Sequence, residues 1–98
     1  MDTAEIDSLL VKARVRAICF AAIVDVDAEK IAGKISLEDY QNALTRIREY
    51  AMTGGLSEST IRSAYELAHA CQGKWTLIQE PRTMLRHARI LFQIGGRY

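Results

Sequence analysis

The chain has 98 residues and a formal net charge of +1, with 49% hydrophobic and 26% charged residues. A chain of this length and balance is typical of one soluble globular domain, because it can bury one core but not a second. One proline and six glycines exclude a disordered linker or a low-complexity tract, so we expect residues 1–98 to form a single domain.

The most apolar stretch, residues 17–24, predicts a central helix. Its eight residues carry no charge, and a stretch that is apolar on all sides belongs inside a packed structure. A buried strand is the alternative, since Ile, Val and Phe favour strands. The flanks favour a helix, because apolar residues recur alternately four and three residues apart, at Ile6, Leu10, Ala13, Ala17, Phe20 and Val24.

The ends of this first helix are marked by capping residues. Asp2 or Thr3 can cap its start, and Gly33 is suited to follow its end. Asp25 and Asp27 are poor helix formers, which leaves a kink or a break at these positions as an open alternative.

Three further helices are expected after residue 35. Ser36 begins the second helix and Gly54-Gly55 stops it, while the third covers residues 57–72 from its cap at Ser57. Pro81 fits the first turn of the last helix, where its missing N–H has no cost. Short connections between amphipathic helices predict an all-α fold, a compact bundle of about four helices.

The apolar stretch and the two cysteines bear on location. Residues 17–24 are too few to span a membrane, which takes roughly 20 apolar residues, and they begin too late for a signal peptide. We therefore expect a cytoplasmic protein without membrane association. Cys19 and Cys71 occupy apolar helix positions, which predicts two reduced, buried thiols rather than a disulfide.

Residues suited to catalysis or zinc binding are few. His69 and Cys71 are two apart on a helix, so their side chains point in different directions. Cys19 and His87 add no ligand spacing to them. We therefore expect no enzyme, no metal and no cofactor.

One acidic stretch resembles an EF-hand calcium loop. Asp25 and Asp27 precede Gly33, and Asp39 stands near the place of the last ligand. An EF-hand loop has twelve residues, with glycine at position 6 and a bidentate Glu at position 12. Here residues 30–32 are inserted before the glycine, and an Asp stands in place of the Glu. These departures weigh against calcium binding.

A second stretch resembles a helix-turn-helix, the DNA-binding pair of helices. The motif needs a small residue in its first helix, a glycine at the turn and apolar residues in its second helix. The matching positions are Ala51, Gly55, Leu56, Ser57, Thr60, Ile61 and Ala64. The resemblance implies that the helix 57–72 enters the major groove and presents Ser59, Arg62 and Ser63 to the bases. An ordinary pair of helices with a Gly-Gly turn explains the same pattern.

Charge is unevenly distributed along the chain, and the C-terminal part is basic. Residues 1–60 carry seven Lys or Arg against ten Asp or Glu, a net −3, whereas residues 61–98 carry six against two, a net +4. A basic half can attract nucleic acid, an acidic protein surface or the acidic half of a second copy, or it can simply be solvated. Within it the last helix repeats polar positions at four, three and four, and two flanking cations complete the predicted basic stripe: Arg82, Arg86, Arg89, Gln93, Lys74 and Arg97.

The sequence therefore favours binding over catalysis. Our first hypothesis is a small non-catalytic helical interaction protein that regulates or inhibits a partner protein with an acidic surface, bound through the basic stripe. The alternative is a helix-turn-helix transcriptional regulator that binds DNA. A homodimer is also expected, because the two halves of the chain carry opposite charge.

Overall fold

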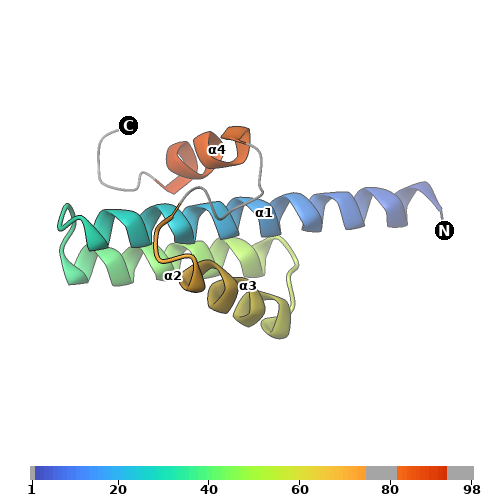
Figure 1. Ribbon diagram of the computed structural model, residues 1–98. Coiled ribbons are helices and arrows are strands. Elements are labelled where there is room, and N and C mark those ends of the chain that lie inside the picture. The colour runs from blue at the N-terminus through green and yellow to red at the C-terminus, as the bar shows by residue number, and fades with distance from the viewer. Residues whose placement is uncertain (1, 75–81, 93–98) are drawn as a thin grey trace.

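The computed structural model of the chain describes residues 2–74 and 82–92, the first four of the second range as backbone only. Four helices follow one another, namely α1 (Thr3–Ile31), α2 (Leu37–Thr53), α3 (Glu58–Ala70) and α4 (Arg82–Phe92). The described residues contain no strand. The predicted all-α bundle of about four helices is confirmed (Figure 1).

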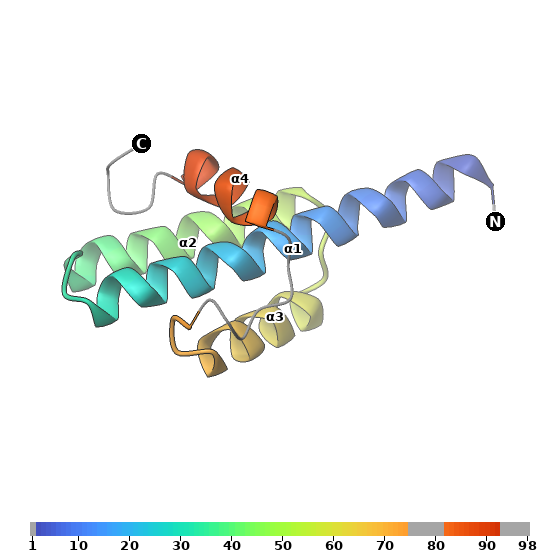
Figure 2. The ribbon, with the colours of Figure 1, turned by 45° about the horizontal axis from the view of Figure 1, so that its top comes forward.

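Helix α1 is the central helix, and the other three helices pack against it. It continues as one helix through Asp25 and Asp27, so the break considered from the sequence does not occur. Helices α2, α3 and α4 each contact α1 far more than they contact one another. In both views α3 and α4 lie on opposite sides of α1 (Figures 1 and 2). The molecule is elongated along this axis, with extents of 47 × 25 × 25 Å.

The core lies along the second half of α1. Every residue from Ala21 to Val26 is buried, together with Ile18 and Cys19, whereas Phe20 is only partly buried against the core. The other helices contribute apolar side chains at three- and four-residue spacing, and most of these are alanines, which let the helices approach α1 closely. These buried residues are Ala43, Ile47 and Ala51 of α2, Ile61, Ala64 and Ala68 of α3, and Ala88 and Phe92 of α4.

The helix ends follow the expected capping residues. Asp2 caps α1 by accepting from the Glu5 N–H at 2.8 Å, and Ser36 caps α2 by accepting from the Asp39 N–H at 3.1 Å. Ser57 accepts from the Thr60 N–H at 3.2 Å and caps α3. After α1, Gly33 adopts a φ of +71°, the left-handed conformation that glycine takes without a steric penalty.

Both cysteines are free and buried, as predicted, and this leads to an expected difference in reactivity. Burial raises the pKa of the Cys19 thiol from 9.0 to about 12, which lowers its thiolate fraction near neutral pH about a thousandfold. We expect iodoacetamide at pH 8 to alkylate Cys71 first, since it retains slight exposure. Peptide mass spectrometry over time measures the order, with the urea-unfolded chain as control. Equal rates at Cys19 in the folded and unfolded chains would show that this thiol is accessible.

Candidate interaction surfaces

Helix α4 packs on α1 with one face and leaves a mixed basic and apolar face outside. Ala88 and Phe92 are buried, and the Phe92 ring meets Tyr50 of α2 edge to face with 5.4 Å between ring centres. The opposite face carries exposed side chains, including two large apolar ones that are 63% (Ile90) and 49% (Leu91) exposed. We call this face the α4 outer surface, formed by Arg86, His87, Ile90 and Leu91.

Arg89 was predicted to belong to the basic stripe, but the structure gives it a contact within the bundle. Its Nη2 and Nε donate to one carboxylate oxygen of Asp25, at 2.8 and 3.2 Å. Asp25 lies on α1 and is 1% exposed, whereas the Arg89 side chain is 37% exposed. Burial raises the pKa of Asp25, and the adjacent guanidinium lowers it in part. Arg89 therefore ties α4 to the core helix.

A second buried carboxylate, that of Asp27, connects α1 to the two remaining helices. The hydroxyl of Tyr40 on α2 donates to its Oδ1 at 2.6 Å, and Nδ1 of His69 on α3 lies 2.7 Å from its Oδ2. Asp25 and Asp27 are two residues apart on a helix, so they point to nearly opposite sides of α1. The two aspartates together thus reach all three surrounding helices.

This polar network was missed from the sequence, although a signal for it was present. Asp25 and Asp27 continue the apolar stretch and are as buried as its members. Acidic residues are almost never fully buried unless they are paired, so two of them in such a stretch indicate partners elsewhere in the chain. Nothing in the sequence singled out Tyr40, His69 and Arg89 as those partners.

The remaining members of the predicted basic stripe fall into two groups. Lys74 and Arg86 are exposed. The side chain of Arg82, and the residues Gln93 and Arg97, lie outside the described residues.

The predicted DNA-binding face of α3 is exposed and mixed in charge. The three residues proposed to contact bases are all at the surface: Ser59, Arg62 and Ser63. Glu66 shares this face, and Glu58 at the start of α3 is held by both of its oxygens to the Arg48 guanidinium at 2.7 Å. Helices α2 and α3 pack mainly on α1 rather than against each other.

The described part of the chain has no group of three or more His, Cys, Asp or Glu side chains placed to hold a metal ion. Within residues 2–74 and 82–92, no helix has both the length and the apolar character that crossing a membrane requires. Of the histidines and cysteines singled out from the sequence, His69 is joined to Asp27, and Cys19 and Cys71 are buried separately in the core.

The first turns of α1 form a projecting N-terminal arm, which we define as residues 2–14. All of these residues are exposed, and the arm extends beyond the other helices (Figure 2). Four large apolar residues lie on it without cover from the rest of the described chain: Ile6, Leu9, Leu10 and Val11. Exposed apolar residues gathered in one segment indicate a contact surface.

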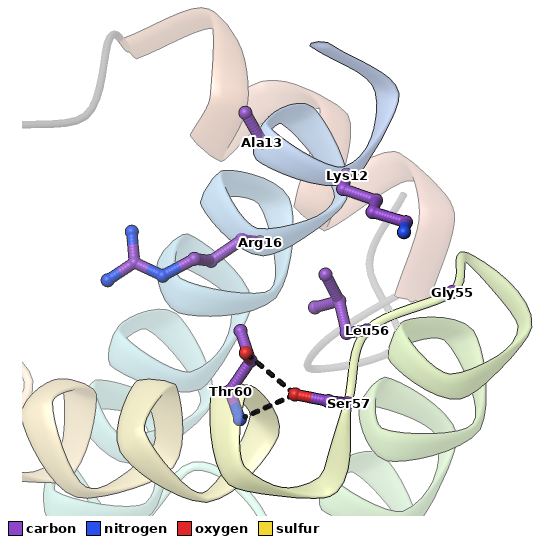
Figure 3. Close-up of a pocket in the computed structure, with 7 residues that line it drawn as sticks. All are labelled: Lys12, Ala13, Arg16, Gly55, Leu56, Ser57 and Thr60. Carbon is purple, nitrogen blue, oxygen red and sulfur yellow. Dashed lines mark hydrogen bonds between the residues drawn. The ribbon is translucent and has the colours of Figure 1, made fainter. Parts of the chain in front are cut away.

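A shallow pocket of about 280 Å³ lies where the arm joins the bundle, and we call it the arm-base pocket. Its walls are Lys12, Ala13 and Arg16 of α1 and the loop that leads into α3, from Gly55 to Ser57, with Thr60. Leu56 stands at its centre, and Lys12 and Arg16 extend to either side (Figure 3). The pocket is therefore apolar at its floor and basic at its rim.

The α4 outer surface and the N-terminal arm are two candidate interaction sites of this protein. Comparisons with models of known protein families, with curated proteins and with solved structures found no match to this chain.

Proposed function

We propose that this protein is a small non-catalytic interaction protein of the cytoplasm that regulates or inhibits a partner protein. The observation that carries the proposal is the α4 outer surface. Ile90 and Leu91 remain exposed although the same short helix buries Ala88 and Phe92. The centre of a protein interface is more apolar than the rest of the surface, and arginine is enriched in interfaces.

The chemistry of this surface defines the partner that it fits. Arg86 and Ile90 are four residues apart, as are His87 and Leu91, so each basic or titratable side chain lies next to an apolar one. A partner with an apolar patch bordered by carboxylates complements this arrangement. The carboxylates would speed encounter through long-range attraction, and the apolar contact would slow dissociation.

Two side chains that could act as nucleophiles, those of Cys19 and Tyr65, take part in the packing of the bundle. The thiol of Cys19 is buried, and its pKa of about 12 keeps it protonated near neutral pH. Burial also raises the pKa of the Tyr65 hydroxyl to about 12, and this hydroxyl donates to the Leu44 carbonyl at 2.6 Å. These groups serve packing and hydrogen bonding in the bundle.

DNA binding through α3 is the second candidate function. The observation that favours it is the exposure of Ser59, Arg62 and Ser63 on one helix face. Glu66 on that face opposes it, because a carboxylate would be turned toward phosphate groups.

Two exposed arginines on different helices separate these functions. The full-length chain carrying Arg86→Glu or Arg62→Glu is used to retain partners from an extract of the source cells, and retained proteins are quantified against wild type. We expect Arg86→Glu to lower retention of the specific partner at least tenfold, because the change replaces attraction by repulsion. We expect Arg62→Glu to leave retention unchanged.

Binding to duplex DNA is titrated with the same variants at several salt concentrations. Affinity that falls steeply with salt and is lost in Arg62→Glu would support the DNA-binding alternative. Equal retention by wild type and Arg86→Glu would contradict the proposed role of the α4 outer surface. Circular dichroism controls for folding, since exposed substitutions of this kind alter stability by only about 0.5 kcal/mol.

A further inference from the structure

We propose that the N-terminal arm pairs with the arm of a second copy of this chain, side by side and antiparallel. This inference goes beyond the proposed function and does not depend on the α4 outer surface. Four apolar residues of the arm fall at spacings of three and four, so they share one face about 100° wide: Ile6, Leu9, Leu10 and Ala13. This is the pattern of a helix that packs against another helix.

The arm has the physical properties of a segment that lacks its partner. It continues α1 for about three turns beyond the bundle, and none of its residues is buried. A helix of this length without tertiary packing is marginal in water. Packing its apolar face would remove Ile6, Leu9 and Leu10 from water and stabilise the helix together with the contact.

The charges along one arm are complementary to those along a second arm that runs in the opposite direction. Its first part, residues 2–7, carries Asp2, Glu5 and Asp7 and no basic residue. Its last part carries Lys12 and Arg14, and Arg16 follows directly after the arm, with no acidic residue among residues 12–16. In an antiparallel pair the acidic end of each copy lies beside the basic end of the other. A parallel pair would place like charges together, which is destabilising.

One pair of residues gives the expected register. Asp7 and Arg14 are seven residues, or about two turns, apart, so they lie on the same edge of the apolar face. With the twofold axis midway between them, Asp7 of each copy meets Arg14 of the other. A twofold contact of this kind is closed, so association stops at the dimer.

The arm-base pocket extends the contact. In this register Glu5 of one arm lies at the level of Arg16 on the other copy, because the numbers of facing residues sum to about 21. Arg16 lines the arm-base pocket together with Lys12 and Leu56, so the acidic Glu5 meets the basic side of that pocket. We expect a contact between two short arms to bury less than the roughly 1,200 Å² of a stable complex, and the dimer to dissociate in the micromolar range.

Two neighbouring residues of the arm provide a matched test. Leu10 (63% exposed) belongs to the apolar face, whereas Val11 (58% exposed) lies about 100° further round the helix. Sedimentation velocity is measured on full-length wild type, Leu10→Asp and Val11→Asp from about 1 to 500 µM, the range around the expected dissociation constant. We expect wild type to reach twice the 11.0 kDa of one chain. We expect Leu10→Asp to weaken association at least tenfold and Val11→Asp to leave it within threefold of wild type.

Charge exchange tests the antiparallel register. Asp7→Arg alone and Arg14→Asp alone each set like charges against one another, and we expect each to weaken the dimer at least threefold. The double variant, which carries both changes, restores the opposite pairing and should recover wild-type association. Circular dichroism confirms that each variant folds. A monomer at every concentration, equal losses in Leu10→Asp and Val11→Asp, or no recovery in the double variant would overturn the proposal.

Discussion

Replacement of Arg89 by methionine is expected to lower the free energy of unfolding by about 3 kcal/mol, because it leaves a buried carboxylate without its charged partner. Methionine keeps most of the length and apolar contact of the arginine stem. What it removes is the pair of hydrogen bonds to Asp25, at 2.8 and 3.2 Å. Among the described residues the other oxygen of Asp25 is buried without a hydrogen-bond partner, so the contact with Arg89 matters more for this carboxylate. Urea unfolding monitored by circular dichroism measures the loss.

Arg86→Met is the matched control, since Arg86 lies on the same helix and is exposed. We expect it to change stability by less than about 0.5 kcal/mol. A double-mutant cycle isolates the contact: in an Asp25→Asn background, Arg89→Met should cost under about 1 kcal/mol. A full 3 kcal/mol loss in that background would assign the effect to the packing of the arginine stem instead.

The loss in Arg89→Met should also depend on pH. Burial already raises the pKa of Asp25 above its ordinary 3.8, and removal of the guanidinium takes away the influence that lowers it. A carboxyl whose pKa is higher in the folded chain binds its proton more tightly there. Stability of the variant therefore rises as the pH falls through the folded-state pKa toward 3.8, and it declines as the pH rises through that pKa. We expect the gap to wild type to narrow as the pH falls toward 3.8; a gap that does not change with pH would contradict this account.

The second large effect is expected for Gly73→Ala, again about 3 kcal/mol of lost stability. Gly73 follows α3 with a φ of +73°, and a Cβ there would lie 2.7 Å from the Cα of Ala28 on α1. The left-handed conformation costs alanine about 1 to 2 kcal/mol. The clash adds about 1 to 3 kcal/mol more, because backbone of the central helix cannot move aside cheaply.

Gly33→Ala separates these two contributions. Gly33 has nearly the same φ of +71°, but no atom lies within 4 Å of the position that its Cβ would take. We expect this control to lose only the conformational part, about 1 to 2 kcal/mol. Equal losses at Gly33 and Gly73 would mean that the close contact of Gly73 with α1 adds nothing to the loss of stability. Thermal and urea melts of both variants give the comparison.

The sequence was sufficient for the elements of this fold because their signals are local. Ser36 and Ser57 mark helix starts by accepting a backbone N–H three residues later, which needs no information from elsewhere in the chain. Gly33 marks a helix end in the same way. The apolar spacing of residues 6–24 predicted a helix and its apolar face. It did not reveal that this face stays exposed at Ile6 and Leu10. Periodicity shows which face is apolar, and only the fold shows what covers it.

The candidate surfaces were harder to predict because they depend on pairing across distant segments. Arg89 and Asp25 are 64 residues apart in the chain, and Asp27 and His69 are 42 apart. A helical repeat of arginines suggested one continuous basic stripe, yet it could not separate Arg86, which faces outward, from Arg89, which reaches into the bundle. The separation follows from the position of α4 on α1, set by the burial of Ala88 and Phe92.

The arrangement of three helices around one axis has a consequence for how substitutions combine. Helices α3 and α4 lie on opposite sides of α1 and contact it far more than each other in the described chain, so these two interfaces are nearly independent. Changes on these two helices, such as Ile61 on α3 and Phe92 on α4, should have additive effects on stability. Ile23 lies on the central helix α1, so a change there should have effects on stability that do not add to those of changes on the outer helices. Substitutions can therefore accumulate separately on α3 and on α4, while α1 constrains both.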